Sequence, residues 1–122
     1  MQSVLRITKA LADNNRLRII MALGESSELC ACQIIELLEI SGATVSRHLS
    51  ILQNAGLLQS RKDGRWMHYR LVDDNADPMA REALDWISHS LKISKKSRKD
   101  IRKLKTILKT DPEMLCARQR KN

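Results

Sequence analysis

The chain has 122 residues, of which 43% are hydrophobic and 30% charged, and its formal net charge is +8. A chain of this length is expected to fold as one domain with a modest core, and without a run of about eighteen apolar residues it is not expected to cross a membrane. The cationic excess favours a polyanionic partner, double-stranded DNA first, because two tryptophans, one tyrosine and no phenylalanine are too few for stacking on RNA or single strands.

The amino-terminal segment and the cysteines indicate the cellular compartment. The opening segment, MQSVLRITKALADNNRLRII, lacks the continuous apolar core of an export signal. A cytoplasmic protein is therefore expected. Three cysteines in such a protein point to metal or redox chemistry rather than to a disulfide scaffold.

Two helices are predicted at the start of the chain. Residues 3–12 carry apolar side chains at helical spacing, which indicates a first helix. Asp13 or Asn14 is expected to cap a second helix, and Gly24 is expected to end it. The segment SSELC that follows is expected to pair briefly with a later strand.

The next segment predicts a helix-turn-helix. Residues 32–39 have the pattern of a third helix, and Ser41-Gly42 is a break with an N-cap candidate. Apolar side chains at i, i+4 and i+7, from Val45 to Leu52, predict the buried stripe of a fourth helix.

A hairpin is predicted after the fourth helix. Residues 58–72 switch to an alternation of apolar and polar side chains, which indicates two strands. Asp63-Gly64 is the expected hairpin tip. Met67 and Tyr69 are expected to face inward.

The C-terminal third predicts more helix. Pro78 is expected to open a helix whose apolar stripe runs to Leu91. The segment KISKKSRKDIRKLKTILKT is densely basic but keeps a sparse helical spacing of apolar residues, so it either continues that helix or forms a separate one. Pro112 limits it, and EMLCARQRKN is expected to be a polar tail.

The order of these elements predicts a winged helix-turn-helix, a mainly α fold with a small β-hairpin (α+β). Residues 1–92 are expected to form the DNA-binding and dimerisation domain. Residues 93–122 are expected to be a basic helical extension and a polar tail that carries Cys116. A single such module covers few base pairs, so we expect a homodimer, formed by the first and last helices of the winged domain.

The fourth helix and the hairpin carry the predicted DNA contacts. The second helix of a helix-turn-helix lies in the major groove, where Arg47 can donate two hydrogen bonds to guanine, worth about 1–3 kcal/mol of discrimination. Cations around the hairpin tip can reach phosphates or a minor groove. The predicted contacts are Ser41, Thr44, Ser46, Arg47, His48, Ser50, Arg61, Lys62 and Arg65. The alternative is a solvated surface, with His48 satisfied at the edge of the core.

At this point the sequence resembles a known family. The segments ELCAC, SGATVSRHLSILQNAGLL, RKDGRWMHYRL and ADNNRLRIIMAL are similar to those of the ArsR/SmtB metalloregulatory repressors of the arsenic-responsive type, and the resemblance covers about residues 3–92. It implies a homodimeric winged-helix repressor that leaves its operator when a thiophilic ion binds.

The sequence departs from the family pattern in two places. Arsenic-responsive members typically read Cys-Val-Cys-Asp-Leu-Cys where this chain reads Cys-Ala-Cys-Gln-Ile-Ile, so the third thiol is missing. The last helix of the winged domain offers Asp85 and His89 but no second histidine, so the family's zinc site is not expected there. The basic extension after Leu91 also lies outside the common pattern.

The thiols Cys30 and Cys32 are the predicted inducer site. If both lay on one helix, they would point about 200° apart, so chelation requires extended backbone, and a helix beginning at Cys30 would have to unwind its first turn. Thiolates select soft ions, with As(III) or Sb(III) expected first and Cd(II), Pb(II) and Bi(III) also plausible. As(III) and Sb(III) favour three sulfurs, and Cys116 is the one remaining candidate for the third.

Several alternatives stay open at the thiols. Cys116 is either a ligand or a free thiol on the tail, and a hydroxide or a small thiol can replace it. Cys30 and Cys32 can instead be buried as small apolar side chains, or act as a redox switch.

Other functions are less well supported by the sequence. Phosphate-binding loops, nucleophile elbows and paired metal-binding histidines are missing, so an enzyme is not expected. A repressor of the same fold that responds to thiol oxidation or to Cd and Pb is one alternative. A non-specific basic DNA-binding protein is another.

Overall fold

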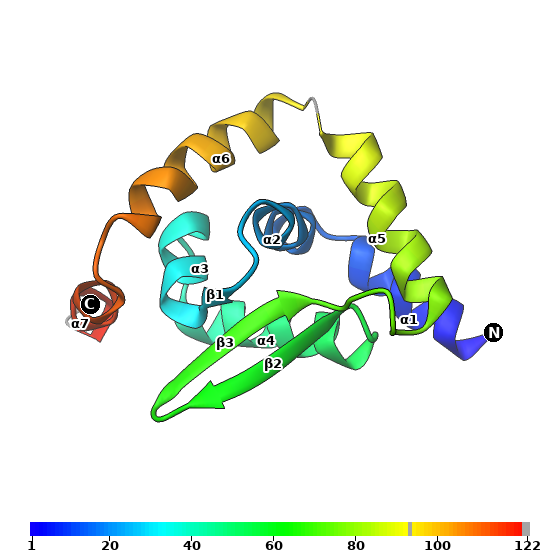
Figure 1. Cartoon of the computed structure of the whole chain (residues 1–122), viewed down its shortest axis with the longest axis horizontal. Coiled ribbons are helices and arrows are strands. Elements are labelled where there is room, and N and C mark those ends of the chain that lie inside the picture. The colour runs from blue at the N-terminus through cyan, green and yellow to red at the C-terminus, as the bar shows by residue number, and fades with distance from the viewer. Residues whose placement is uncertain (93, 121–122) are drawn as a thin grey trace.

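Seven helices and a three-stranded antiparallel sheet make up residues 1–92 and 94–120, the part of the chain that the computed structural model describes (Figure 1). In Figure 1, α2 lies in the middle, with α6 above it and the hairpin below it, and none of these described helices is long and apolar enough to cross a membrane. The elements are α1 (Gln2–Leu11), α2 (Asn14–Glu25), β1 (Leu29–Cys30), α3 (Ala31–Leu38), α4 (Gly42–Asn54), β2 (Leu58–Asp63), β3 (Trp66–Leu71), α5 (Pro78–Leu91), α6 (Lys95–Leu108) and α7 (Pro112–Arg120).

The predicted helix starts are confirmed by side-chain caps. Asp13 Oδ1 accepts a hydrogen bond from the backbone N–H of Asn15 at 2.8 Å, and Ser41 Oγ accepts one from the N–H of Thr44 at 3.2 Å. Pro78 is the first residue of α5, as expected. Such caps satisfy N–H groups that the first turn of a helix leaves unpaired, which is why the boundaries were readable from the sequence.

The sheet has the strand order β1-β3-β2. The predicted pairing of SSELC with a later strand is confirmed, since Leu29 lies opposite Tyr69 and Cys30 opposite His68 in β3. Tyr69 is half-buried against the core, as its place in the alternation predicted. The pairing brings Cys30 to the hairpin and thereby joins the thiol segment to the wing.

The hairpin turns tightly at its tip. Asp63 pairs with Trp66, so the loop consists of Gly64 and Arg65. Gly64 has a φ of 61°, and a positive φ at the first loop position is the feature of tight hairpin turns that favours glycine. The prediction that Met67 faces inward was wrong, because it is 36% exposed near the end of strands that extend beyond the core.

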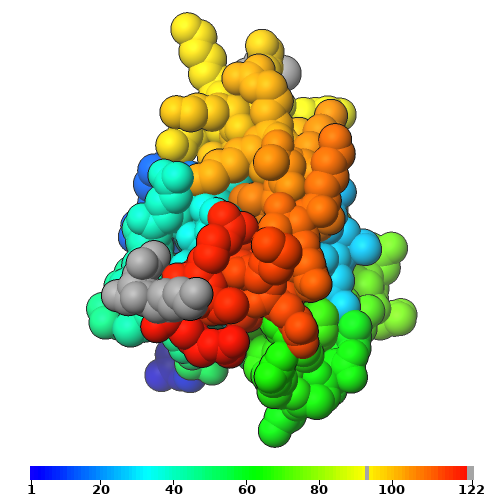
Figure 2. Space-filling model, turned by 90° about the vertical axis from the view of Figure 1, so that its left-hand side faces the viewer, coloured from blue at the N-terminus to red at the C-terminus, as the bar shows by residue number. Residues whose placement is uncertain are grey.

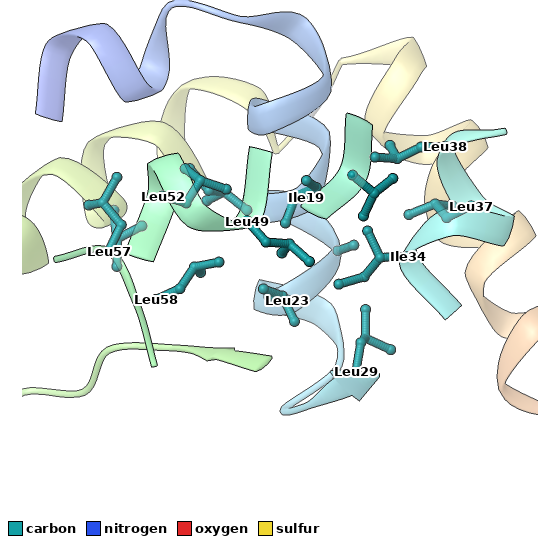
Figure 3. Close-up of a cluster of buried hydrophobic side chains, with 14 of the residues drawn as sticks. Ile19, Leu23, Leu29, Ile34, Leu37, Leu38, Leu49, Leu52, Leu57 and Leu58 are labelled. Atoms are coloured by element: carbon teal, nitrogen blue, oxygen red, sulfur yellow. The ribbon is translucent and has the colours of Figure 1, made fainter. Parts of the chain in front are cut away.

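The core lies between α2, α3, α4 and the base of the hairpin (Figure 3). Burial of each large aliphatic side chain stabilises the fold by about 1.5–3 kcal/mol, so this cluster fixes the helix-turn-helix against the central helix α2. Its labelled members in Figure 3 are Ile19, Leu23, Leu29, Ile34, Leu37, Leu38, Leu49, Leu52, Leu57 and Leu58.

The basic extension forms a helix of its own, α6. It begins at the N-cap Ser94 and packs on α2 and α3 with Leu104 and Ile107, which are 3% and 4% exposed. Arg18 Nε donates to Asp100 Oδ2 at 2.8 Å and Nη2 donates to Oδ1 at 3.1 Å. This two-point ion pair fixes α6 on the central helix α2.

The predicted polar tail is instead the helix α7, which packs against α3. Leu115 is 1% exposed, and Gln119 Nε2 donates to the carbonyl oxygen of Cys32 at 2.9 Å. With a single buried aliphatic residue, the segment has no apolar periodicity that would have indicated a helix. Its place depends on contacts with residues far away in the chain.

Candidate DNA-binding face and thiol site

The outer face of α4 carries most of the predicted DNA contacts. Ser46, Arg47 and Ser50 are exposed, and Thr44 is half-buried. The hydroxyl oxygens of Ser41 and Thr44 lie 2.8 Å apart, within hydrogen-bond distance. The N-terminal half of α4 therefore presents small polar groups around the exposed cation of Arg47, a surface that can approach the floor of a major groove.

His48 does not belong to this face. It is 9% exposed, and its Nδ1 lies 3.1 Å from Nη1 of Arg16. Arg16 also donates to the carbonyl oxygens of Ala10 at 2.7 Å and Lys9 at 3.1 Å. His48 flanks the apolar stripe of α4, so helix geometry turns it toward the end of α1 and away from the exposed face of α4.

Arg61 in the hairpin is held by a carboxylate. Its Nη2 donates to Oε1 of Glu28 at 2.7 Å, and its Nε donates to Oε2 at 2.9 Å. These hydrogen bonds hold the pKa of the Glu28 carboxyl below its usual range. A guanidinium bound in this way contributes less positive charge to a phosphate contact than a solvated one.

Arg65 at the hairpin tip is tied to α7. Its Nη2 donates to Oε1 of Glu113 at 2.8 Å, and its guanidinium carbon lies 5.5 Å from the centre of the Trp66 ring. In Figure 2 the orange and red surface of the C-terminal segment meets the green surface of the hairpin. Lys62, between the two arginines, is also exposed.

Cys30 lies at the junction of β1 and α3. Its φ of −86° and ψ of 163° are extended, and its N–H donates to Oε1 of Gln33 at 2.9 Å. The helix begins after it, so the prediction that ligation must unwind a helical turn at Cys30 does not apply. Cys30 is 2% exposed and borders a cleft of about 490 Å³ that His68 and Glu113 also line.

Cys32 and Cys116 form a disulfide across 84 positions of sequence, with their Cα atoms 5.4 Å apart. Cys116 is therefore no free tail thiol, because α7 carries it to the first turn of α3. Cys30 is the free cysteine of the described residues. No group of three or more His, Cys, Asp or Glu side chains in residues 1–92 and 94–120 is arranged to hold a metal ion.

Three residues at this site escaped prediction from the sequence. Glu28 and Glu113 contact the hairpin, and Gln119 contacts α3. In each pair the two residues lie more than 30 positions apart in the sequence. Short-range patterns carry no signal for such pairs.

Comparison with known proteins places the winged segment among bacterial regulators. A family model described as "Bacterial regulatory protein, arsR family" matches residues 13–60. The chain is 46% identical over 67 residues to the "Arsenical resistance operon repressor" of Escherichia coli K12, covering 55% of this chain and 57% of that protein. It is 37% identical over 89 residues to "Arsenic resistance transcriptional regulator ArsR1" of Pseudomonas putida, covering 67% of this chain and 70% of that protein.

The fold is also similar to a solved structure. "HlyU from Vibrio cholerae" aligns with a TM-score of 0.61 at 25% identity, covering 72% of this chain and 90% of that one. The predicted winged helix-turn-helix is thereby confirmed. The unmatched part of the chain is long enough to contain both C-terminal helices.

Proposed function

Because the chain belongs to the arsR family of bacterial regulatory proteins, we propose that it is a transcriptional repressor that binds operator DNA as a homodimer. A thiophilic ion bound by its cysteines releases it. The family consists of DNA-binding regulators rather than enzymes. The observation that supports ion sensing is that Cys116 lies against Cys32, which is two positions from Cys30 in the sequence.

Operator recognition is assigned to α4 and the hairpin. The exposed Arg47 donates hydrogen bonds to base edges in the major groove, and Ser46 and Ser50 lie beside it. Lys62 and the arginines of the hairpin bind phosphates. Ser41 and Thr44 position the first turn of α4, and His48 supports the helix from behind.

The dimer surface is assigned to α1 and α5, which lie side by side at one end of the molecule (Figure 1). Val4 and Leu5 are 45% and 46% exposed on α1, and Trp86 is 63% exposed on α5. Large apolar side chains gathered on two adjacent helices favour burial against a second copy. The two-fold arrangement then presents two copies of α4 to successive major grooves.

The inducer site consists of Cys30, Cys32 and Cys116, with As(III) or Sb(III) the preferred ion. Arsenite takes three thiols and releases three waters, so the three thiols supply the sulfur set that the segment Cys-Ala-Cys-Gln-Ile-Ile lacks by itself. Ligation requires Cys32 and Cys116 in the reduced form. Cd(II), Pb(II) and Bi(III) are softer or larger ions that the same sulfur set can hold.

Coupling to DNA runs through α7 rather than through unwinding of α3. α7 carries Cys116 and also Glu113, whose carboxylate binds Arg65 at the hairpin tip. When Cys30 joins the other two sulfurs on an ion, α7 shifts relative to β1, and in its new position Glu113 holds Arg65 at the wing away from a DNA phosphate. A ligand changes an equilibrium only by its different affinity for two states, and here the states differ in the position of α7.

One titration tests the proposed function. A labelled duplex from the region upstream of the gene is bound by the reduced protein, and arsenite, antimonite, bismuth, cadmium, lead and zinc are added in turn. We expect arsenite and antimonite to release the duplex at the lowest concentrations and zinc to have no effect. Release that persists in the Cys30→Ser/Cys32→Ser variant contradicts the proposal.

The disulfide favours a second candidate, a repressor that responds to oxidation. Two thiols, Cys32 and Cys116, lose two protons and two electrons to a peroxide, which is reduced to water. Cys30 takes no part in this reaction. A Cys30→Ser variant that loses the arsenite response but keeps a peroxide response would therefore identify redox sensing.

A further inference from the structure

The helix α6 presents a row of cations that the operator-binding face does not use. The row consists of the exposed residues Lys95, Arg98, Lys99, Arg102 and Lys105 of α6 and of Lys109, the C-cap residue that follows the helix. At 100° per residue, these six fall within a sector of about 120°. The opposite side of the helix, with Leu104 and Ile107, is buried against α2 and α3.

Two acidic residues on or beside α6 are already paired with cations outside the row. Asp100 is the one acidic residue of α6, and it is bound by Arg18. Oε1 of Glu39 lies 2.9 Å from Nζ of Lys103, and this hydrogen bond holds the pKa of the Glu39 carboxyl below its usual range. None of the salt bridges found in residues 1–92 and 94–120 involves the six cations. Their charge is therefore available to an external partner.

The row lies on the other side of the molecule from the operator-binding face. α2 and α3 form a layer that packs against α4 on one side and α6 on the other. Figure 1 shows α6 across α2 from α4, and Figure 2 shows α6 at the top and the hairpin at the bottom. Screening limits the reach of exposed charges to about 8–10 Å at physiological salt, so α6 does not act on a duplex held by α4.

We propose that α6 is a second polyanion-binding surface, and that its partner is the phosphate backbone of a separate segment of duplex DNA. The helix is about 21 Å long, which spans about six phosphates along one strand at 3.4 Å per step. A repressor dimer on its operator then carries two such surfaces facing away from it. A neighbouring stretch of DNA can bind there without regard to its sequence.

Two other polyanions fit the surface less well. Residues 95–109 contain no aromatic side chain, so single-stranded RNA finds no stacking platform. An interfacial helix inserts its apolar side into a bilayer, but the apolar side of α6 is buried in the protein. A duplex backbone needs neither feature, because it is bound by charge alone.

The test is a two-duplex capture with the full-length protein. The operator is immobilised and saturated with protein, unbound protein is washed away, and a labelled duplex of unrelated sequence is added at increasing salt. The variant is Arg98→Gln/Arg102→Gln. The matched control is Arg118→Gln/Arg120→Gln, which removes the same two charges from exposed positions of α7.

We expect the wild type and the control to capture the second duplex. The α6 variant should bind it about tenfold more weakly at 0.1 M salt, since each lost phosphate contact lowers the salt slope by about 0.9. Operator affinity should stay within about twofold in all three proteins. Equal capture by the variant, no capture by the wild type, or a matching loss of operator affinity overturns the proposal.

Competition identifies the partner class. Duplex DNA should displace the labelled duplex more effectively than single-stranded RNA or phosphatidylserine vesicles of equal charge, and the reverse order overturns the assignment. If the operator itself is not bound, the proposed function fails, while the difference between the two variants on unrelated duplex still decides the role of α6.

Discussion

Glu113 in the first turn of α7 and Arg65 at the tip of the hairpin are joined by a hydrogen-bonded ion pair of 2.8 Å, across 48 positions of sequence. The pair links the helix that carries Cys116 to the wing. Both side chains are exposed, at 63% and 66%, so the contact is weak. In the proposed complex with DNA, a phosphate would replace Glu113 at Arg65.

Replacing Glu113 with Gln should therefore tighten operator binding. The substitution removes a negative charge that competes with DNA phosphates for Arg65. Exposed ion pairs are worth about 0.2–1 kcal/mol, so we expect the operator Kd to fall by up to about fivefold, measured by fluorescence anisotropy. Glu25→Gln at the end of α2 makes the same change in net charge at another exposed position. An equal effect of both variants would mean that only overall charge matters.

Replacing Cys116 with Ser should weaken arsenite binding. Loss of one of three sulfurs is expected to raise the arsenite Kd by about tenfold or more, which corresponds to about 1.4 kcal/mol or more. Ala117→Ser places a hydroxyl on the same helix without removing a thiol and should leave the affinity unchanged. Unaltered arsenite affinity in Cys116→Ser would exclude this thiol from the site.

Local signals predicted most of the fold, because they depend on residues within one turn or one strand of each other. The caps at Asp13 and Ser41 are examples, as is the Gly64 turn. Contacts between distant segments could not be predicted in this way. Glu28 and Arg61 are 33 positions apart, and nothing near either residue indicates the other.

The thiol site illustrates the same limit. The spacing of Cys30 and Cys32 indicated their chemistry, but their backbone geometry depends on β1 pairing with β3, which holds Cys30 extended. The position of Cys116 depends on α7, a helix with little amphipathic pattern. Its packing on α3 follows from Leu115 and from Gln119, neither of which stands out in the sequence.

Replacing Arg47 with Lys should separate specific from non-specific DNA binding. Lysine keeps the charge but lacks the planar fork with which arginine donates two parallel hydrogen bonds to guanine. Operator affinity should therefore fall by about 1–3 kcal/mol while affinity for random duplex is unchanged. Lys62→Gln should instead weaken binding to both duplexes by a similar factor and reduce the slope of log affinity against log salt by about 1. Equal losses on both duplexes for Arg47→Lys would assign that residue to phosphate binding.

Replacing Asp100 with Asn should destabilise the fold. The Arg18 and Asp100 side chains are 14% and 9% exposed, and removing one charge leaves a nearly buried guanidinium without its counter-ion. Arg18 keeps hydrogen bonds to Asn15 and to the carbonyl oxygen of Leu37, so the expected loss is about 2 kcal/mol. Urea unfolding measures this loss of stability. The control is Asp74→Asn, because the Asp74 side chain is 97% exposed; it should change the free energy of unfolding by less than about 0.5 kcal/mol.

Replacing Leu5 with Glu should break the proposed dimer. Leu5 and Trp86 expose large apolar areas on α1 and α5, and a carboxylate placed between two copies would be buried without a partner. Sedimentation should then show a monomer, and operator affinity should fall because one copy of α4 reaches a single half-site. Met114 on α7 is 59% exposed and equally accessible, so Met114→Glu should leave the dimer intact. A dimer that survives Leu5→Glu but dissociates in Met114→Glu would move the interface to the C-terminal helices.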